Sequence, residues 1–592
     1  MMFLTSGWLS MLYGTFLLAL LLFFSCRSGR WLLQLAGFSC FWDGLDEECL
    51  VATGLGLTVL SLGTLALGVC GGLSRIPALV WLAVFAIPVF LVKPVGERVV
   101  TGPPAWVWYL CVLVILLSWI QTLAPPTGQD ALAYHLENAK QWVLRHRVAY
   151  LPDTRESLWP SQTEMLYALG LLIQGTPLAQ LFHWAFYLLT SCGVFCLARR
   201  LGGVAVASAA AIIFLMTPAA FAQSGQAYID LALAFFTLLA VYPLLMSGDG
   251  KSARLAALSG FFAGAACGTK YLGLGCALVL FVLWVLRSKF ERKVILSFVV
   301  AVLAIGGIWY FRSWRTLGNP FYPFFSKWFG GNGFDFPVAE NVGLGHGPLH
   351  FIFFLWNMTL HPVPFGGQLL GPLYLMLLPF LLLLLPKINP RGLFLGAFIF
   401  FYLLFLFVQS QQTRFFLSAA PLLAVTVALG LSEALQKNGF LKKTAWFCLV
   451  MIGTAHFGIY FMRVHKVWPV VIQKELAEVY LEREDRSFRI YRYLNEHQKP
   501  GETFFNAGDA RFFYGPPGAE FDSVPLRRRL SRNGKDIFQF ISERNFNYVL
   551  VAQDTETGLE RYLASHSYRD VLSYEAEEKP AVYRYTLYYL PG

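Results

Sequence analysis

The sequence has few charged residues: Asp, Glu, Lys and Arg together make up 14% of 592 residues. Soluble globular chains carry about a quarter charged residues, so this composition excludes an ordinary soluble enzyme. The mean hydropathy is +0.55, and 16% of the residues are aromatic. Apolar runs of about 20 residues, enough to cross roughly 30 Å of hydrocarbon, recur along the chain. The sequence therefore predicts a polytopic α-helical membrane protein.

Cysteine is missing from the polar C-terminal tail. All ten cysteines precede residue 449, whereas the tail starts near residue 463. No disulfide framework is therefore expected for the tail. The chain also has no recognisable internal repeat. Its first apolar run, 8–26, is followed by Arg27 and Arg30 and is interpreted as a first span, not as a cleavable signal.

The net charge of +11 does not indicate nucleic acid as a partner, because the basic residues lie in alternate short loops between the apolar runs. The intervening loops, such as AFAQSGQAYID and QSQQTR, carry few basic residues. This pattern assigns the basic loops to the cytoplasmic side. The basic loops contain Arg199 and Arg200, Lys251 and Arg254, Arg287 to Lys293, Lys387 and Arg391, and Lys437 to Lys443.

The apolar runs predict about 14 spans, with both chain ends away from the cytoplasm. The pair at 255–270 and 271–286 is treated as one hairpin divided at Lys270. The expected spans are 8–26, 51–70, 77–93, 105–123, 177–198, 204–221, 228–246, 255–270, 271–286, 294–314, 369–386, 392–410, 414–435 and 444–462. They place the loops at 124–176, 222–229, 315–368 and 410–414 outside, together with the tail.

Three outer segments are too long for simple turns. In the loop 124–176, LAYHLENAKQWVLRHR predicts an amphipathic helix at the interface, and TEMLYALGLLIQG an apolar segment that lies flat or re-enters. The loop 315–368, rich in Gly, Pro and aromatics, predicts an irregular cover over a cavity. In the tail, DRSFRIYRYLNEHQ predicts a helix, and ETFFNAG, NYVLVAQ and AVYRYTLYYL predict strands. We expect a small extracytoplasmic α/β domain over 463–592.

Ionisable side chains gather at the outer ends of the spans. A charge at mid-helix costs at least about 2.5–3.5 kcal/mol in a bilayer, so such residues are functional candidates. Acids and bases at one level suit a reaction in which a base deprotonates an acceptor while cations hold a phosphate leaving group. Burial would raise the basicity of a catalytic carboxylate. The candidates are Asp130, His135, Glu137, Glu164, Asp230, Lys270 with the adjoining Tyr271, Arg312, Arg315 and Arg414.

Six of the candidates also have a structural explanation. Asp130 follows Gly128 and precedes a helical stretch, which favours helix capping equally. Asp230 opens a span, where the helix dipole favours an acid. Lys270 is explained by snorkelling, and Arg414 by anchoring at the membrane boundary. A lone histidine such as His135 more often packs at an interface than ligates a metal, and Glu164 is also explained by headgroup contact.

Taken in order, several segments resemble the GT-C glycosyltransferases, in particular the branch of the lipid A aminoarabinose transferase and the protein O-mannosyltransferases. The resemblance covers roughly 105–435. Its segments are PPTGQDALAYHLENAK, WPSQTEMLYALG, GQAYIDLALAFF, GFFAGAACGTKYLGL, WYFRSWRTLGNPFYPF and SQQTRFFLSAAPLL. It implies a GT-C-like catalytic core over 105–462, preceded by extra helices over 1–104.

The resemblance also implies roles for single residues. Family members carry an acid in the first outer loop, which acts as general base or positions the acceptor, and Asp130 matches its place. Asp230 in AYID resembles the acid of the next outer loop. Basic residues of the family hold the phosphate of a polyprenyl-phosphate sugar, and here Lys270, Arg312 and Arg414 are the candidates.

Two departures limit what can be carried over. Three spans precede the one that resembles the family's first. The first loop reads QDALAYH, without the paired Asp-Glu of the protein O-mannosyltransferases. The sequence therefore does not support protein as the acceptor or mannose as the sugar. Some superfamily members use a divalent metal, but no spacing here resembles HExxH or a cysteine cluster. A divalent metal stays open, because Asp130, His135, Glu164 and Asp230 offer oxygen and nitrogen ligands, but no metal site is predicted.

These observations predict an inverting membrane glycosyltransferase. It would move a sugar from a polyprenyl-phosphate donor to an envelope lipid, glycan or protein outside the cytoplasmic leaflet, and a bacterial inner membrane fits the family. Two alternatives stay open. A transporter or flippase of a lipid-linked sugar would also have many spans and cations for a phosphate, although it needs no base at the outer mouth. An inactive relative would use the tail as an assembly module.

Overall fold

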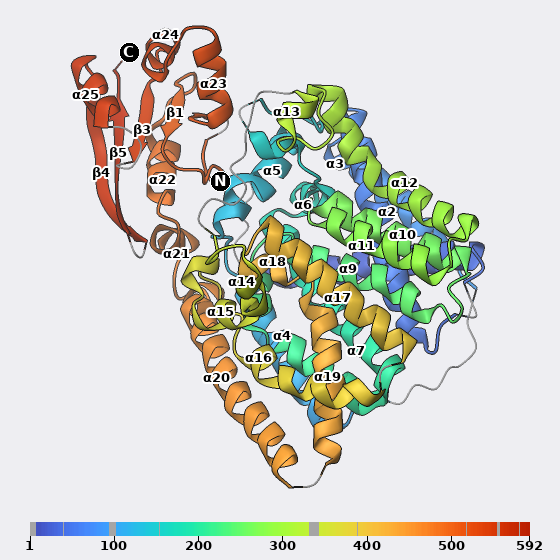
Figure 1. Ribbon diagram of the computed structural model, residues 1–592. Coiled ribbons are helices and arrows are strands. Elements are labelled where there is room, and N and C mark those ends of the chain that lie inside the picture. Colours follow the sequence, from blue (N-terminus) through green and yellow to red (C-terminus); the bar gives the residue numbers. More distant parts are fainter. Residues whose placement is uncertain are drawn as a thin grey trace.

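The computed structural model describes residues 8–38, 41–93, 102–152, 154–330, 342–387, 389–437, 439–516, 518–552, 557–578 and 581–591. It is a bundle of helices with a small sheet domain at one end (Figure 1). Each range expected to span the membrane corresponds to helix. These helices are α1 (Trp8–Leu35), α2 (Leu45–Val69), α3 (Arg75–Ala86) with η1 (Ile87–Phe90), α4 (Ala105–Thr122), α7 (Thr176–Leu215), α9 (Asp230–Met246), α10 (Ala253–Thr269), α11 (Gly273–Arg287), α12 (Arg292–Leu317), α16 (Leu373–Leu377) with η5 (Leu378–Lys387), α17 (Pro390–Gln409), α19 (Ala420–Gln436) and α20 (Phe440–Val471).

Seven helices of the described chain are long and apolar enough to cross a membrane: α1, α2, α4, α7, α12, α17 and α20. Shorter apolar helices accompany them, among them α9, α11 and α19. With 40 residues, α7 joins two expected spans, and the chain breaks between them at Gly203 (φ 79°, ψ −177°). Glycine fits this position because residues with a side chain rarely adopt such a φ. The prediction of a multi-pass helical membrane protein is confirmed.

Close helix packing sets the position of α10. A Cβ atom at Gly260 would come within 2.3 Å of the carbonyl oxygen of Phe298 on α12, and one at Gly264 within 2.8 Å of that of Val302. Small residues four apart let two helix backbones approach in this way. The end of α10, which carries Lys270, is therefore held firmly against α12.

The first helices are packed into the bundle by buried ion pairs. On α2, Glu48 accepts from Arg30 of α1 at 3.0 Å, and Glu47 from Arg200 of α7 at 2.8 Å. Both glutamates are buried, and α2 contacts α6 (Gln162–Ile173) and α7. The Arg30–Glu48 pair thus joins two of the extra helices, and the Glu47–Arg200 pair joins α2 to α7 in the rest of the bundle. Removing one partner of such a buried pair would leave an uncompensated charge.

The first outer loop is more enclosed than expected. It contains a π turn η2 (Ala131–His135), α5 (Leu136–Leu144), η3 (Arg155–Leu158) and α6. The predicted helix is present as η2 and α5, but Leu136, Ala139 and Trp142 are buried within the protein. Residues 162–171 of α6 are also buried, because α6 packs against α2, α5 and α7. A flat position of α6 on the membrane surface is therefore wrong.

Within its described residues, the outer loop 315–368 forms short helical pieces after the end of α12, as its composition predicts. They are α13 (Ser326–Phe329), α14 (Pro348–Ile352), α15 (Phe354–Leu360) and η4 (Val363–Phe365). Residues 331–341 of this loop lie outside the described residues.

The tail forms the expected small α/β domain. The three predicted strands are β1 (Phe504–Ala507), β3 (Tyr548–Ala552) and β5 (Ala581–Tyr589), and the predicted helix is α22 (Phe488–His497). The sheet order is β2-β1-β3-β5-β4, with β1 parallel to β2 and β3 and β5 antiparallel to β3 and β4. The sequence reading missed β2 (Glu520–Phe521), β4 (Arg569–Glu578), α21 (Ala477–Glu484), α23 (Val524–Arg532), α24 (Ile537–Arg544) and α25 (Thr557–Ser565).

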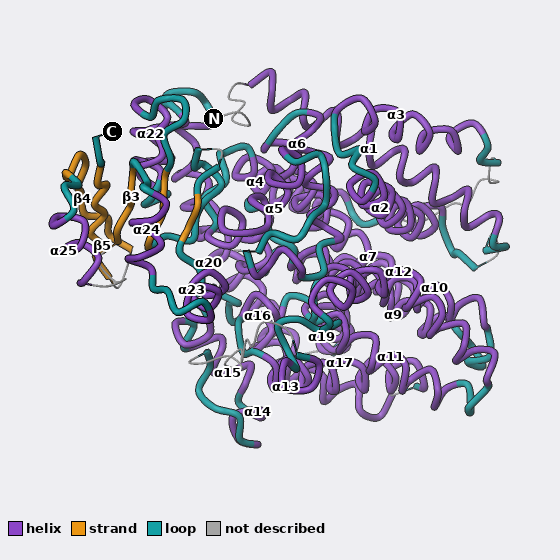
Figure 2. Tube along the Cα trace, turned by 90° about the horizontal axis from the view of Figure 1, so that it is seen from above, coloured by secondary structure: helices purple, strands orange, loops and turns teal. Residues whose placement is uncertain are grey.

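The tail is attached to the first outer loop by hydrogen bonds. The backbone N–H of Phe513 donates to the carbonyl of Leu132 at 3.2 Å, and the Tyr514 hydroxyl to that of Pro126 at 2.8 Å. The Lys140 ammonium donates to the Phe513 carbonyl at 2.7 Å. Seen from above, the strands gather at one end of the helical body (Figure 2). The tail therefore lies directly beside the loop that carries Asp130.

Candidate active site

Asp130 and Arg414 form an ion pair between the first outer loop and α18 (Thr413–Phe416). The Tyr134 hydroxyl donates to the same carboxylate oxygen at 2.8 Å, and the Arg414 Nε donates to Gln412 at 2.8 Å. Among the described residues, the Asp130 side chain accepts no capping hydrogen bond from η2. Helix capping therefore does not explain Asp130, and membrane anchoring does not explain Arg414.

The pKa of Asp130 is lowered to about 2. Burial alone would raise it, but the Arg414 charge, the His135 side chain and the hydrogen bond from Tyr134 outweigh burial. The neighbouring carboxylates in turn raise the pKa of the Arg414 guanidinium against the effect of burial. The expectation that burial makes Asp130 more basic is therefore wrong while Arg414 is paired with it.

Asp230 and Lys270 form a second pair, 2.8 Å apart, between the first turn of α9 and the end of α10. The Asp230 side chain is 2% exposed and that of Lys270 16%. The Lys270 ammonium lies 3.9 Å from the centre of the Phe415 ring, and the Arg414 guanidinium 5.1 Å from it. Snorkelling therefore does not explain Lys270, because its charge points to a buried carboxylate and an aromatic face.

The two pairs belong to one cluster of alternating charge. Arg414 also interacts electrostatically with Asp230, and Lys270 with Asp130, around the Phe415 ring between the two cations. Residues from four separate chain segments meet here, as the predicted combination of acids and phosphate-binding cations requires. Chemically, the cluster offers two carboxylates for proton transfer or positioning and two cations for an anionic leaving group.

His135, Glu137 and Glu164 are buried beside this cluster in pairs of their own. The His135 Nδ1 lies 2.8 Å from Glu164, and the His135 ring 6.0 Å from that of Tyr228. Glu137 pairs with Lys140 at 2.8 Å. His135 and Glu164 join η2 to α6, and the Glu137–Lys140 pair lies where the tail attaches. Both pairs therefore support the loop that positions Asp130.

The remaining candidates lie away from the four-residue cluster. The Tyr271 hydroxyl donates to the Tyr322 carbonyl at 2.5 Å. The Arg312 guanidinium donates to the carbonyls of Ser157 and Trp159 at 2.8 and 3.1 Å. Arg315 is exposed near the end of α12. In this structure Arg312 thus holds the first outer loop against α12.

Sequence reasoning missed four residues around the cluster. Tyr134 lies one helical turn after Asp130, Phe415 follows Arg414 directly, and Tyr228 lies under the Arg414 guanidinium at 5.7 Å. His183, on α7, accepts from the backbone N–H of Leu231 through Nε2 at 3.2 Å, next to Asp230. His183 could have been found, because an ionisable residue inside an apolar run is a functional candidate by default. The aromatic residues carry no such signal.

A metal site does not emerge from these contacts. Among the residues that the structure describes, no group of three or more His, Cys, Asp and Glu side chains is arranged to hold a metal ion. The carboxylates of Asp130 and Asp230 are each bound to a cationic side chain.

Comparison with known proteins finds similarity to one family model and to solved structures. Residues 177–324 match the family model of dolichyl-phosphate-mannose-protein mannosyltransferase, a segment that contains Asp230 and Lys270. The structure is similar to ArnT from Cupriavidus metallidurans bound to undecaprenyl phosphate, with a TM-score of 0.57 and 16% identity over 82% of this chain and 98% of that one. The protein has a GT-C fold. The resemblance read from the sequence is thereby confirmed.

Two further comparisons differ in extent. The apo structure of the same ArnT gives a TM-score of 0.55 at 16% identity, covering 82% of this chain and 97% of that one. An uncharacterised protein of Shigella flexneri is 29% identical over 126 residues, which are 21% of this chain and 63% of that protein. The coverage of ArnT shows that the GT-C similarity extends beyond the segment matched by the family model.

Proposed function

We propose that this protein is a membrane glycosyltransferase. It transfers a sugar from a polyprenyl-phosphate donor to an envelope lipid, glycan or protein on the extracytoplasmic side, with inversion at the anomeric carbon. The observation that supports this most directly is the cluster of Asp130, Arg414, Asp230 and Lys270. The matched family segment and the GT-C fold support it further, since they concern glycosyltransferases.

Lys270 and Arg414 hold the donor phosphate in this mechanism. The acceptor oxygen attacks the anomeric carbon, the bond from that carbon to the phosphate oxygen breaks, and polyprenyl phosphate leaves with the bonding electrons. The two cations stabilise the charge that develops on the leaving phosphate, typically the largest electrostatic contribution in such sites. The acceptor proton passes to Asp130, while Asp230 keeps Lys270 in position.

Donor binding and the basicity of Asp130 are linked in this mechanism. Arg414 now pairs with Asp130 and depresses its pKa to about 2. A donor phosphate that draws Arg414 away removes this effect, and burial then raises the Asp130 pKa. Asp130 thus becomes a stronger base when the donor is bound. While the donor site is empty, Asp130 stays paired with Arg414 and is a weak base, which disfavours unproductive reactions.

The direct test is release of polyprenyl phosphate. Purified protein in lipid receives a panel of polyprenyl-phosphate sugars and an envelope extract as acceptor. We expect release from one donor, dependent on the extract, with strong loss in Arg414→Gln. Lys293→Gln, an exposed change at the other end of α12, is the control and should match the wild type. Movement of a lipid-linked sugar across the bilayer without release would instead identify a flippase.

A further inference from the structure

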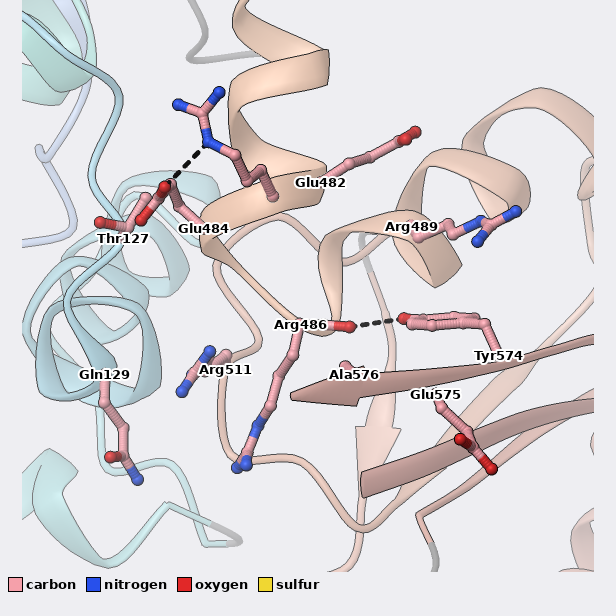
Figure 3. A pocket seen from close by; sticks show the side chains of 11 residues that line it. Thr127, Gln129, Glu482, Glu484, Arg486, Arg489, Arg511, Tyr574, Glu575 and Ala576 are labelled. Atoms are coloured by element: carbon pink, nitrogen blue, oxygen red, sulfur yellow. Dashed lines mark hydrogen bonds and ion pairs between the residues drawn. The ribbon is translucent and has the colours of Figure 1, made fainter. Parts of the chain in front are cut away.

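A pocket of about 490 Å³ lies between the tail and the first outer loop. Thr127 and Gln129 line it from the loop, while Arg486, Arg489 and Arg511 line it from the tail. In Figure 3 the guanidinium groups of Arg486 and Arg511 lie on the side towards Gln129, and Arg489 lies beyond them, towards Tyr574. With Arg483, four arginines of the tail thus line a cavity whose opposite wall includes Gln129, the residue before Asp130.

Two of these arginines are held from behind by buried carboxylates. Arg486 pairs with Asp509 at 3.2 Å and Arg511 with Asp485 at 3.5 Å, and both aspartate side chains are 0% exposed. The Arg486 guanidinium also lies 4.1 Å from the centre of the Tyr583 ring. A guanidinium fixed in this way loses little side-chain freedom when it binds an anion, and its planar donors match a carboxylate or phosphate.

Two of the three acidic residues that line the pocket, Glu482 and Glu484, are paired with cations. Glu484 is bound to Lys466 at 2.6 Å and to Arg483 at 3.0 Å, and Glu482 to Arg492 at 2.8 Å. Their charges are therefore offset by cations at the rim. Glu575, on β4, lies across the pocket from Gln129 (Figure 3). The lining arginines on the side of the Asp130 loop are thus Arg486 and Arg511, each held by a buried aspartate.

We infer that this pocket binds the acceptor through an anionic group, a phosphate or a carboxylate carried by a sugar. This inference rests on the proposed function. Because Gln129 precedes Asp130 in the chain, an acceptor anchored by Arg486 and Arg511 lies beside the base that takes its proton. The arginines supply charge-assisted hydrogen bonds to the acidic group. The tail then selects an acidic acceptor.

The test measures binding directly, without turnover. Ligand-observed NMR on the full chain in lipid nanodiscs compares glucose 1-phosphate, glucuronic acid and neutral glucose at millimolar concentration. We expect saturable binding of at least one acidic sugar and none of glucose. The acidic sugar that binds more tightly identifies phosphate or carboxylate as the anchored group.

Three variants assign binding to the pocket. The Kd of the acidic sugar should rise in each of Arg486→Gln, Arg489→Gln and Gln129→Glu. For Arg486→Gln we expect a rise of roughly tenfold, because a hydrogen bond to a charged group contributes that much to affinity. Gln129→Glu lies outside the tail and is exposed, so it tests the pocket even if Arg486→Gln disturbs the tail. The control is Lys535→Gln, which removes an exposed charge elsewhere on the tail and should leave the Kd unchanged.

The outcomes separate this inference from the proposed function. Equal binding of glucose, absence of binding by both acidic sugars, or an unchanged Kd in all three variants would overturn the acceptor pocket. Undecaprenyl phosphate binding, measured on the same samples, reports the site at Lys270 and Arg414 instead. Binding of an acidic sugar in the pocket without binding of undecaprenyl phosphate would support the acceptor pocket and refute the donor site at Lys270 and Arg414.

Discussion

Replacing Asp130 with Asn should stop sugar transfer while the protein keeps its fold. Asparagine retains an oxygen that accepts from the Tyr134 hydroxyl, now at 2.8 Å, but it cannot take a proton from an acceptor. A positioned general base contributes about 10²–10⁴-fold to a rate, or about 3–5 kcal/mol of barrier. We therefore expect kcat for polyprenyl phosphate release to fall at least about 100-fold in Asp130→Asn.

The cost to stability is smaller than the loss of activity. The depression of the Asp130 pKa from 3.8 to about 2 corresponds to about 2 kcal/mol at neutral pH. This stabilisation is complete above pH about 4 and is lost as pH falls through about 2. The side chains of Asp130 and Arg414 are 20% and 18% exposed, and Asp230 still attracts Arg414 in the variant. The variant should therefore remain folded, with a somewhat lower melting temperature.

Donor affinity should change in the opposite direction. In Asp130→Asn the Arg414 guanidinium no longer has to leave a carboxylate before it binds a phosphate, so undecaprenyl phosphate should bind more tightly, by up to roughly tenfold. The assay pairs single-turnover release with equilibrium binding in the same nanodiscs. Glu156→Gln, the same chemical change in the same outer loop, is the matched control. Turnover within about threefold of wild type, or weaker donor binding, would refute the assigned role of Asp130.

Three further changes test neighbouring parts of the structure. Lys270→Gln should weaken undecaprenyl phosphate binding by roughly tenfold or more, because a charge-assisted contact is lost, and an unchanged Kd would remove Lys270 from the donor site. Arg312→Gln should lower the melting temperature and leave the donor Kd near wild type, since its guanidinium binds two loop carbonyls; a large loss of donor affinity alone would contradict this. In the tail, burial raises the pKa of Asp485 to about 6 against the attraction of Arg511, with Asp509 adding to the rise. The folded tail then binds more protons than the unfolded chain between pH about 4 and 6, so its free energy of unfolding should fall by about 3 kcal/mol as pH rises through that range. Hydrogen exchange in β3 measures this fall, and the pH dependence should be absent in Asp485→Asn.

The sequence predicted the membrane part of this fold better than the geometry of its site. Long apolar runs locate spans reliably because the bilayer sets their length, so even the break at Gly203 coincides with a gap between two expected spans. The candidate acids and cations were found because charge near a bilayer is costly. Which cation pairs with which acid was not predictable, since Asp130 and Arg414 lie 284 residues apart.

Local sequence patterns failed to predict secondary structure and burial where tertiary contacts determine them. The strand β4 was missed because DVLSYEAEE alternates only weakly, and its pairing with β5 supplies what its own sequence lacks. The amphipathic stretch around Trp142 was expected to lie at the membrane interface, but it is buried against α6, and its Lys140 contacts the tail. An apolar helical face indicates burial without saying whether lipid or protein covers it.

Charge pairing explains how the site can lie at the membrane and also how its parts are coupled. Asp130 with Arg414 and Asp230 with Lys270 are each close to neutral, which lowers the cost of burying four ionised groups. A donor phosphate that binds both cations must compete with both carboxylates, so donor binding and carboxylate release are linked reciprocally. In the proposed reaction this linkage sets the order of events. The donor first engages the cations, Asp130 then gains basicity, and the acceptor held beside Gln129 loses its proton only when a leaving group is in place.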